Sequence, residues 1–107
     1  MDTFTVRDLR ERTGKLIGDA ESGELSLITK HGRPVFVALP FDETLIQSGV
    51  LLSLAIKLYQ DEVLSLEKAA KLAGIGVAQF TEELARHGLA AARYPADELE
   101  DELAIFD

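Results

Sequence analysis

The residues of this chain that could do chemistry are cations near its N-terminus. Arg10 has no acid among its neighbours at helical spacing, and Arg7 has only Glu11, in the less favourable order. The other two cations of this segment follow acids at the i,i+4 spacing that neutralises charge on a helix: Asp8–Arg12 and Glu11–Lys15. If a hairpin turn packs near the start of the helix, one cationic spot suited to phosphates and base edges results, made of Arg7, Arg10, Lys30, His31 and Arg33. The alternative interpretation is a set of ordinary solvated surface cations.

Catalytic and metal-binding patterns are missing from the sequence. There is no cysteine, and neither His31 nor His87 has an acid at the spacing of a zinc site or a catalytic triad. Residues 74–76 (Gly-Ile-Gly) lack the preceding strand and the Gly-Lys-Ser/Thr ending of a phosphate loop. We therefore expect no enzymatic activity, no cofactor and no metal ion.

Length and composition limit the architecture. The chain has 107 residues, of which 47% are apolar, and its 11 basic and 19 acidic residues give a net charge of -8. This size predicts one small domain or two very small ones. The absence of cysteine suits a reducing cytoplasm. The N-terminus has no apolar stretch like that of a signal peptide, and no apolar run approaches the length of a membrane span. We expect a cytoplasmic protein without membrane association.

The N-terminal half carries both strand and helix signals. Residues 3–6 alternate like a strand, and Thr5 with Asp8 forms a capping box. One helix is expected to bury a stripe made of Val6, Leu9, Thr13, Leu16, Ile17 and Ala20. Residues 25–29 and 35–39 read as paired strands around a turn at Gly32, with Pro34 at a strand start or a sheet edge.

The C-terminal half reads as helical. Asp42 is expected to cap a helix that breaks near Ser48 and Gly49. Further helices are expected over 66–73 and 77–87, separated by a turn at Gly74. The predicted fold class is therefore α+β, with a small antiparallel sheet and helices in residues 1–49 and an all-α, helix-turn-helix-like domain in residues 50–107. Its second helix is expected to expose Gln79, Glu82, Glu83 and Arg86, whose charge is at best balanced where a helix that faces phosphates should be positive.

Two stretches of the N-terminal half resemble the N-terminal domain of prevent-host-death (Phd/YefM) antitoxins: residues 4–10, FTVRDLR, and residues 27–35, LITKHGRPV. The resemblance covers about residues 3–46. It implies a dimeric domain that binds the operator of its own toxin–antitoxin genes. Arg10 matches the helix arginine that such antitoxins use on DNA, and Lys30 matches the basic residue before the turn. Arg7 stands where many members have a small or polar residue.

The second half departs from that family. Residues 54–104 are similar to a small uncharacterised family of helical antitoxin-like proteins, which implies a partner toxin, often a PIN-domain ribonuclease. The C-terminal segment is acidic, and we expect it to bind a cationic toxin through four apolar and aromatic residues: Tyr94, Leu99, Leu103 and Phe106. The alternative for this segment is a solvated terminal helix.

Together these features predict a type II antitoxin that neutralises its toxin by direct binding and represses its own operon. We expect it to be a homodimer with a core formed by Leu9, Leu16, Ile17, Leu27, Val35 and Val37, because residues 1–49 cannot bury enough surface alone. Two alternatives remain. One is a solitary DNA-binding regulator without a toxin, and the other is a protein-interaction adaptor that does not bind DNA.

Overall fold

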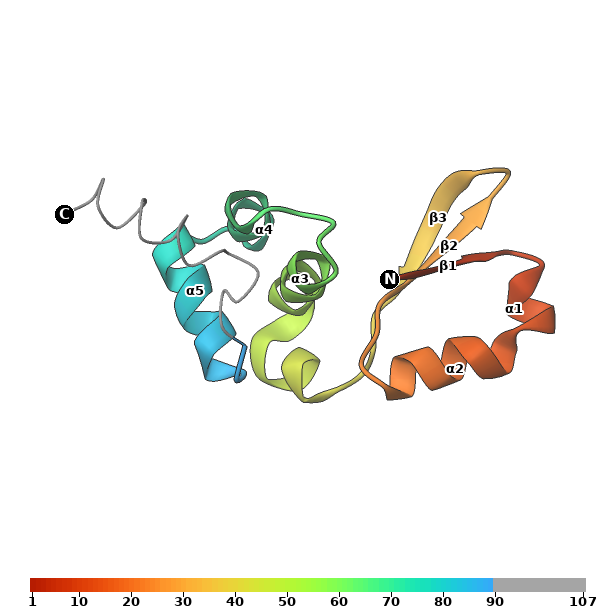
Figure 1. Cartoon of the computed structure of the whole chain (residues 1–107), viewed down its shortest axis with the longest axis horizontal. Coiled ribbons are helices and arrows are strands. Elements are labelled where there is room, and N and C mark those ends of the chain that lie inside the picture. The colour runs from red at the N-terminus through yellow and green to blue at the C-terminus, as the bar shows by residue number, and fades with distance from the viewer. Residues whose placement is uncertain (90–107) are drawn as a thin grey trace.

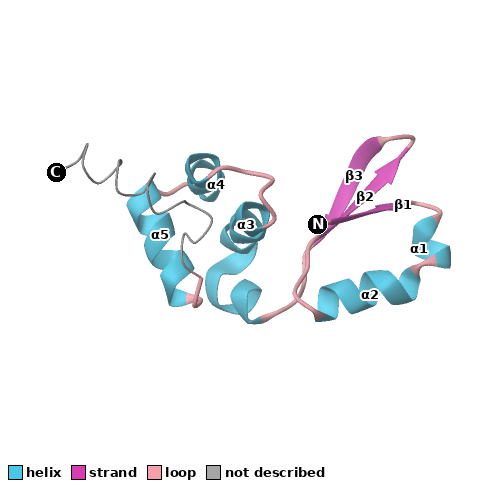
Figure 2. Ribbon diagram, viewed as in Figure 1, coloured by secondary structure: helices cyan, strands magenta, loops and turns pink. Residues whose placement is uncertain are grey.

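A three-stranded mixed sheet with two short helices forms the N-terminal part of the protein, and three further helices follow it (Figures 1 and 2). The computed structural model describes residues 1–89. The elements in order are β1 (Asp2–Thr5), α1 (Asp8–Glu11), α2 (Thr13–Glu21), β2 (Ser26–Lys30), β3 (Arg33–Ala38), α3 (Glu43–Gln60), α4 (Leu66–Ala73) and α5 (Val77–Arg86). The expected α+β fold class is confirmed.

The sheet has the strand order β1-β2-β3, with β2 in the centre. β2 and β3 are antiparallel and are joined by a two-residue turn, in which His31 (φ 51°) and Gly32 (φ 77°) both adopt the positive φ that such tight hairpins require. Pro34 lies in the edge strand β3, where its missing N–H costs little, as expected. β1 pairs with β2 in parallel, with Asp2 opposite Ser26. The sequence analysis expected an antiparallel sheet, so this pairing is a correction.

A capping box starts the first helix, as predicted. The backbone N–H of Thr5 donates to Asp8 Oδ2 (2.9 Å), and the N–H of Asp8 donates to Thr5 Oγ1 (3.1 Å). The expectation of one continuous helix is wrong, because Arg12 leaves the helical conformation (φ -122°, ψ 32°) between α1 and α2. The Thr13 hydroxyl donates to the Leu9 carbonyl, and such back-bonding by threonine bends helices.

The expected buried stripe on these helices is also wrong for the described chain. Val6 is 44% exposed and Ile17 is 53% exposed, and Leu16 is only half-buried. The break at Arg12 interrupts the helical period on which the stripe depended. The fully buried apolar side chains of the sheet half are few: Phe4, Leu25, Ile28 and Pro40.

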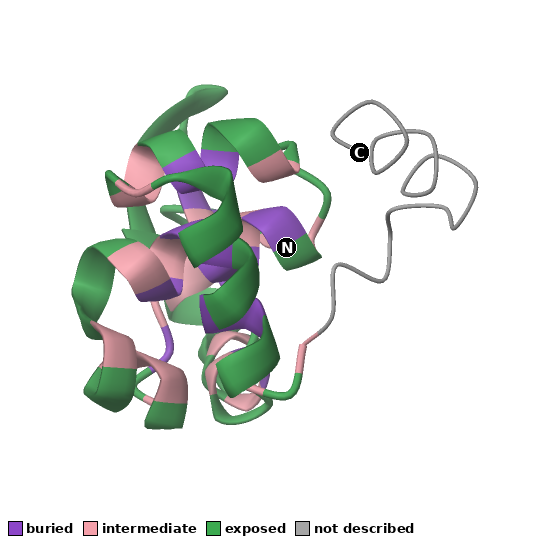
Figure 3. Ribbon diagram, turned by 90° about the vertical axis from the view of Figure 1, so that its left-hand side faces the viewer, coloured by how far each residue is buried: buried purple, intermediate pink, exposed green. Residues whose placement is uncertain are grey.

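The helical half holds the larger core. Asp42 caps α3 by accepting from the Leu45 N–H (3.1 Å), and the expected break falls at Gly49 (φ 84°). Ser65 caps α4, and Gly74 ends it in the left-handed conformation. The buried cluster consists of Ala55, Ile56, Tyr59, Ala69, Ala70, Phe80 and Leu84, from the second half of α3 and from α4 and α5 (Figure 3). Within residues 1–89, no helix combines the length and apolar character needed to cross a membrane.

A buried lysine joins the two halves. Lys57, on α3, donates to the carbonyl of Gly23 and to Asp42 Oδ2, both at 2.8 Å. The N-terminal amine of Met1 also lies 3.1 Å from Asp61, just after α3. These contacts fix the sheet half against α3.

Candidate nucleic-acid interface

An open groove lies where the end of β1, the start of α1 and the β2–β3 hairpin meet. It has a volume of about 410 Å³ and is lined by Thr5, Val6, Arg7, Thr29, Lys30 and His31. The Val6 N–H donates to the Thr29 carbonyl (3.0 Å), which extends the β1–β2 pairing and holds Arg7 beside the end of β2. The structure therefore brings Arg7, Lys30 and His31 onto one concave surface.

A second, smaller hollow adjoins the groove. It has a volume of about 240 Å³ and is lined by Val6, Arg7, Arg10 and Glu11, so Arg7 borders both hollows. Arg10 thus lies next to the groove but does not line it. Arg33 lines neither hollow and pairs with Lys30 across the hairpin turn. Of the five expected cations, three line the groove and two flank it. We call this set, Arg7, Arg10, Lys30, His31 and Arg33, the cationic groove.

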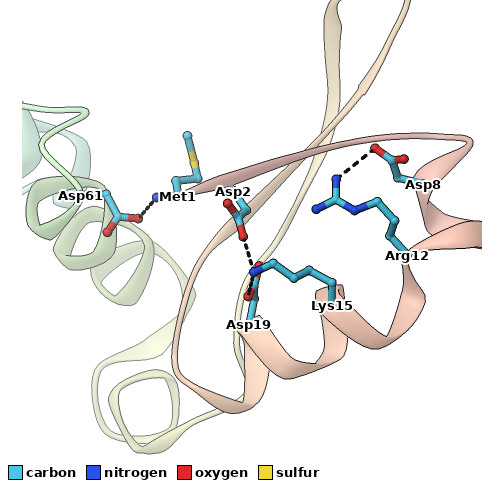
Figure 4. A network of polar contacts seen from close by, with 7 residues as sticks. All are labelled: Met1, Asp2, Asp8, Arg12, Lys15, Asp19 and Asp61. Carbon is cyan, nitrogen blue, oxygen red and sulfur yellow. Dashed lines mark hydrogen bonds and ion pairs between the residues drawn. The ribbon is translucent and has the colours of Figure 1, made fainter.

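The cations of the groove have no ion-pair partner within residues 1–89, whereas the other cations of α1 and α2 are neutralised. Arg12 lies 3.6 Å from Asp8 and 4.8 Å from the ring centroid of Phe4, as a cation–π contact. The Asp8–Arg12 pair is therefore confirmed (Figure 4). Asp8 is held ionised chiefly by the Thr5 backbone N–H, which lowers the pKa of this carboxyl against its desolvation.

The expected Glu11–Lys15 pair is wrong. Lys15 turns the other way and binds Asp19 (2.8 Å) and Asp2 (2.9 Å), which ties α2 to β1 (Figure 4). Hydrogen bonds to Asp19 and Asp2 raise the pKa of Lys15, and contacts with Asp19 and Lys15 lower the pKa of Asp2. Lys15 is thus paired with two carboxylates at once, and Glu11 lines the smaller hollow instead.

The arrangement can bind anions. Guanidinium and ammonium groups on an open surface suit phosphate oxygens, and Arg can also read a base edge with two hydrogen bonds. Thr5 and Thr29, which were not expected in the site, also line the groove and pair across β1 and β2. The alternation of residues 3–6 and 25–29 was the signal that could have placed them together.

Carboxylates of Asp2, Asp19 and Glu24 also converge, but Lys15 already neutralises two of them.

The helical half departs from the expected surface in one respect. Glu83 was expected to be exposed, but it is buried and lies 3.1 Å from Arg86. Its position on α5 turns it towards the core, so Arg86 is used in neutralising it.

The residues expected to bind a toxin lie outside the described residues: Tyr94, Leu99, Leu103 and Phe106.

Sequence comparisons place the chain in a family. Residues 34–107 match the family model described as "Uncharacterised protein family (UPF0175)". A "UPF0175 protein" of Aeropyrum pernix is 38% identical over 60 residues, which cover 56% of this chain and 76% of the relative. No solved structure matches the chain. The match begins in β3 and is therefore longer than the expected 54–104, and all five cationic-groove residues precede it. The protein belongs to the uncharacterised family UPF0175.

Proposed function

We propose that this protein is the antitoxin of a type II toxin–antitoxin system. In this proposal the sheet half is a Phd/YefM-like domain that binds operator DNA as a homodimer and represses its own operon. The helical half, with the acidic segment after it, neutralises a toxin by covering its surface, and the protein catalyses no reaction. The single observation that carries the proposal is the cationic groove.

The groove supports DNA binding because its charge is local. The chain as a whole carries a net charge of -8, so a diffuse attraction to nucleic acid does not exist. Arg7, Lys30 and His31 nevertheless share one concave surface without an ion-pair partner in the described part of the chain. In this proposal Lys30 and Arg7 contact phosphates, and Arg10 reads a base.

The exposed side of the sheet supports a homodimer. Val35 is 55% exposed and Val37 is 38% exposed on the edge strand β3, and Val37 lies opposite the half-buried Leu27 on the same face. Ile17 on α2 is 53% exposed. These residues belong to the set expected to form the dimer core. A two-fold dimer would present two cationic grooves to a palindromic operator.

The toxin is proposed to be a ribonuclease, and the resemblance of residues 54–104 implies one with a PIN domain. A ribonuclease needs positive charge to hold RNA, and residues 90–107 carry six carboxylates and one arginine. The test is growth of a host that expresses the open reading frame next to this gene, with and without this protein. Arrest that the protein relieves supports the antitoxin role, and a harmless neighbour contradicts it.

The DNA-binding proposal is tested by gel shift on the DNA upstream of the gene. Arg10→Ala should weaken binding by about 1 to 3 kcal/mol. Lys30→Ala should remove one phosphate contact, and so reduce by about 1 the slope of the logarithm of the binding constant against the logarithm of the salt concentration. Lys71→Ala is the matched control, because Lys71 is an exposed cation of α4 outside the groove. A folded Arg10→Ala variant with undiminished binding would contradict the proposal.

Two other functions are separated by the same assays. A solitary regulator that uses both halves on DNA would lose affinity in Lys71→Ala as well, and it would have no toxin. Exposed Lys68 and Lys71 on α4 are the observation in its favour. An adaptor would bind no DNA at any salt concentration, as the overall negative charge would suggest.

A further inference from the structure

Exposed apolar residues also lie just before α3 and on both sides of its kink at Gly49, away from the cationic groove. Phe41 is 85% exposed, Ile46 62%, Val50 64% and Leu51 51%. Single exposed apolar residues are ordinary, but four within residues 41–51 concentrate exposed apolar surface in one short segment, as interaction surfaces do. We call these four residues the α3 face.

A kink at Gly49 divides this surface, with Ile46 before it and Val50 and Leu51 after it. Gly49 has φ 84° and ψ 172°, so the helix before it does not continue the axis of the helix after it (Figure 1). The second half of α3 contributes Ala55, Ile56 and Tyr59 to the buried core. The residues Phe41, Ile46, Val50 and Leu51 are not part of that core and stay exposed.

The described chain ends beside the first half of α3. Leu89 packs against the helical core, and two residues earlier His87 Nε2 lies 2.6 Å from Ser48 Oγ. Ser48 sits between Ile46 and Val50 in the sequence. Whatever follows Leu89 therefore starts next to the α3 face.

The segment that follows has matching chemistry. Leu99, Leu103 and Phe106 recur at spacings of four and three, which is the spacing of one face of a helix, and acids occupy most positions between them. When extended, residues 90–98 can span up to about 30 Å. The surface that they would have to reach is shorter, because residues 46–51 extend over only about 8 Å along a helix. The segment is long enough to reach the α3 face of its own molecule.

We propose that Leu99, Leu103 and Phe106 dock on the α3 face of the same chain. Their burial against Ile46, Val50 and Leu51 removes apolar surface of both segments from water, while the carboxylates stay solvated. This inference does not depend on DNA or toxin binding. Where the proposed antitoxin role holds, a toxin that uses the same three side chains must first displace them, so docking within the chain weakens toxin binding.

Disulfide trapping in the full-length chain tests this docking. The sequence contains no cysteine, so no native thiol competes with the two introduced ones. The test variant is Val50→Cys with Leu103→Cys. The matched control is Val77→Cys with Leu103→Cys, because Val77 is also exposed and apolar (40%) but lies at the start of α5, at the end opposite to His87. We expect the disulfide within one chain to form at least about tenfold faster in the test variant.

A third variant separates docking from chance collision. Adding Phe106→Asp to the Val50→Cys, Leu103→Cys chain should slow disulfide formation to the control rate, with the far-UV circular dichroism spectrum of the folded chain retained. Equal rates in test and control variants, or a rate that Phe106→Asp does not change, would overturn the proposal. A disulfide between two chains would overturn it too, because the α3 face would then take a second copy. None of these readouts involves DNA or a toxin, so the result stands apart from the proposed function.

Discussion

The buried ion pair between Lys57 and Asp42 predicts an unequal response to the loss of either partner. Asp42 uses its two oxygens separately, Oδ1 to accept from the Leu45 N–H and Oδ2 to accept from Lys57. An asparagine has only one oxygen, so Asp42→Asn can keep the helix cap but then turns its amide NH₂ towards the ammonium group. The substitution therefore removes the counterion and leaves the cap in place.

The exposure of each side chain sets how much free energy of unfolding each substitution removes. Lys57 is 7% exposed, so in Asp42→Asn its charge stays buried with only the Gly23 carbonyl as a partner. We expect a loss of about 2 to 4 kcal/mol in the free energy of unfolding. In Lys57→Met the remaining Asp42 is 29% exposed and can be hydrated, and the methionine keeps the apolar stem. That substitution should cost about 1 to 2 kcal/mol, mainly for the unpaired Gly23 carbonyl.

Urea unfolding followed by far-UV circular dichroism measures both losses. Lys68→Met is the matched control, since Lys68 is exposed, and its cost should stay below about 0.5 kcal/mol. The double variant should be more stable than Asp42→Asn alone, because no buried charge is left without a counterion. A Lys57→Met variant that loses more stability than Asp42→Asn would refute the reasoning, as would losses equal to that of the control.

Two further predictions concern pH and assembly. Burial acts to raise the pKa of Asp42, but hydrogen bonds from Lys57 and Leu45 outweigh it and lower that pKa. The ionised Asp42 therefore stabilises the fold fully above the pKa of an aspartate in the unfolded chain, about 3.9. This contribution is lost as the pH falls through the lower pKa of the folded protein. The urea midpoint should therefore fall as the pH drops below about 4, and by less in Asp42→Asn. Equal falls would contradict this assignment. Val37→Glu should convert the proposed homodimer into a monomer, as measured by sedimentation equilibrium. Val63→Glu is the control and should leave the dimer intact, because Val63 is 49% exposed but lies outside the sheet. A dimeric Val37→Glu chain would place the interface elsewhere.

Local features of this fold could be predicted from the sequence. The capping box of Thr5 and Asp8, the caps at Asp42 and Ser65, and the left-handed Gly74 each depend on residues within one helical turn. Such signals do not depend on the rest of the fold, because the donor and acceptor are neighbours in sequence.

Features that join distant residues could not be predicted in this way. Lys15 binds Asp2 across 13 positions, and Lys57 reaches Gly23 across 34. The sequence indicated that Lys15 needs an acid, but several acids were available, and only the fold decides between them. The gathering of Arg7, Lys30 and His31 was expected only on the condition that the hairpin packs near α1, and the parallel β1–β2 pairing supplies that condition.

The parallel pairing also has a kinetic consequence. β1 meets β2 only after the chain between residues 2 and 26 has closed into a loop, whereas α3, α4 and α5 pack against neighbours in sequence. Loop closure costs entropy before its contacts form, so non-local pairing slows folding. We therefore expect the helices to form first during refolding and β1 to join last. Because the cationic groove needs both the end of β1 and the hairpin, it is the last surface of the molecule to be assembled and the first to disappear when the sheet opens.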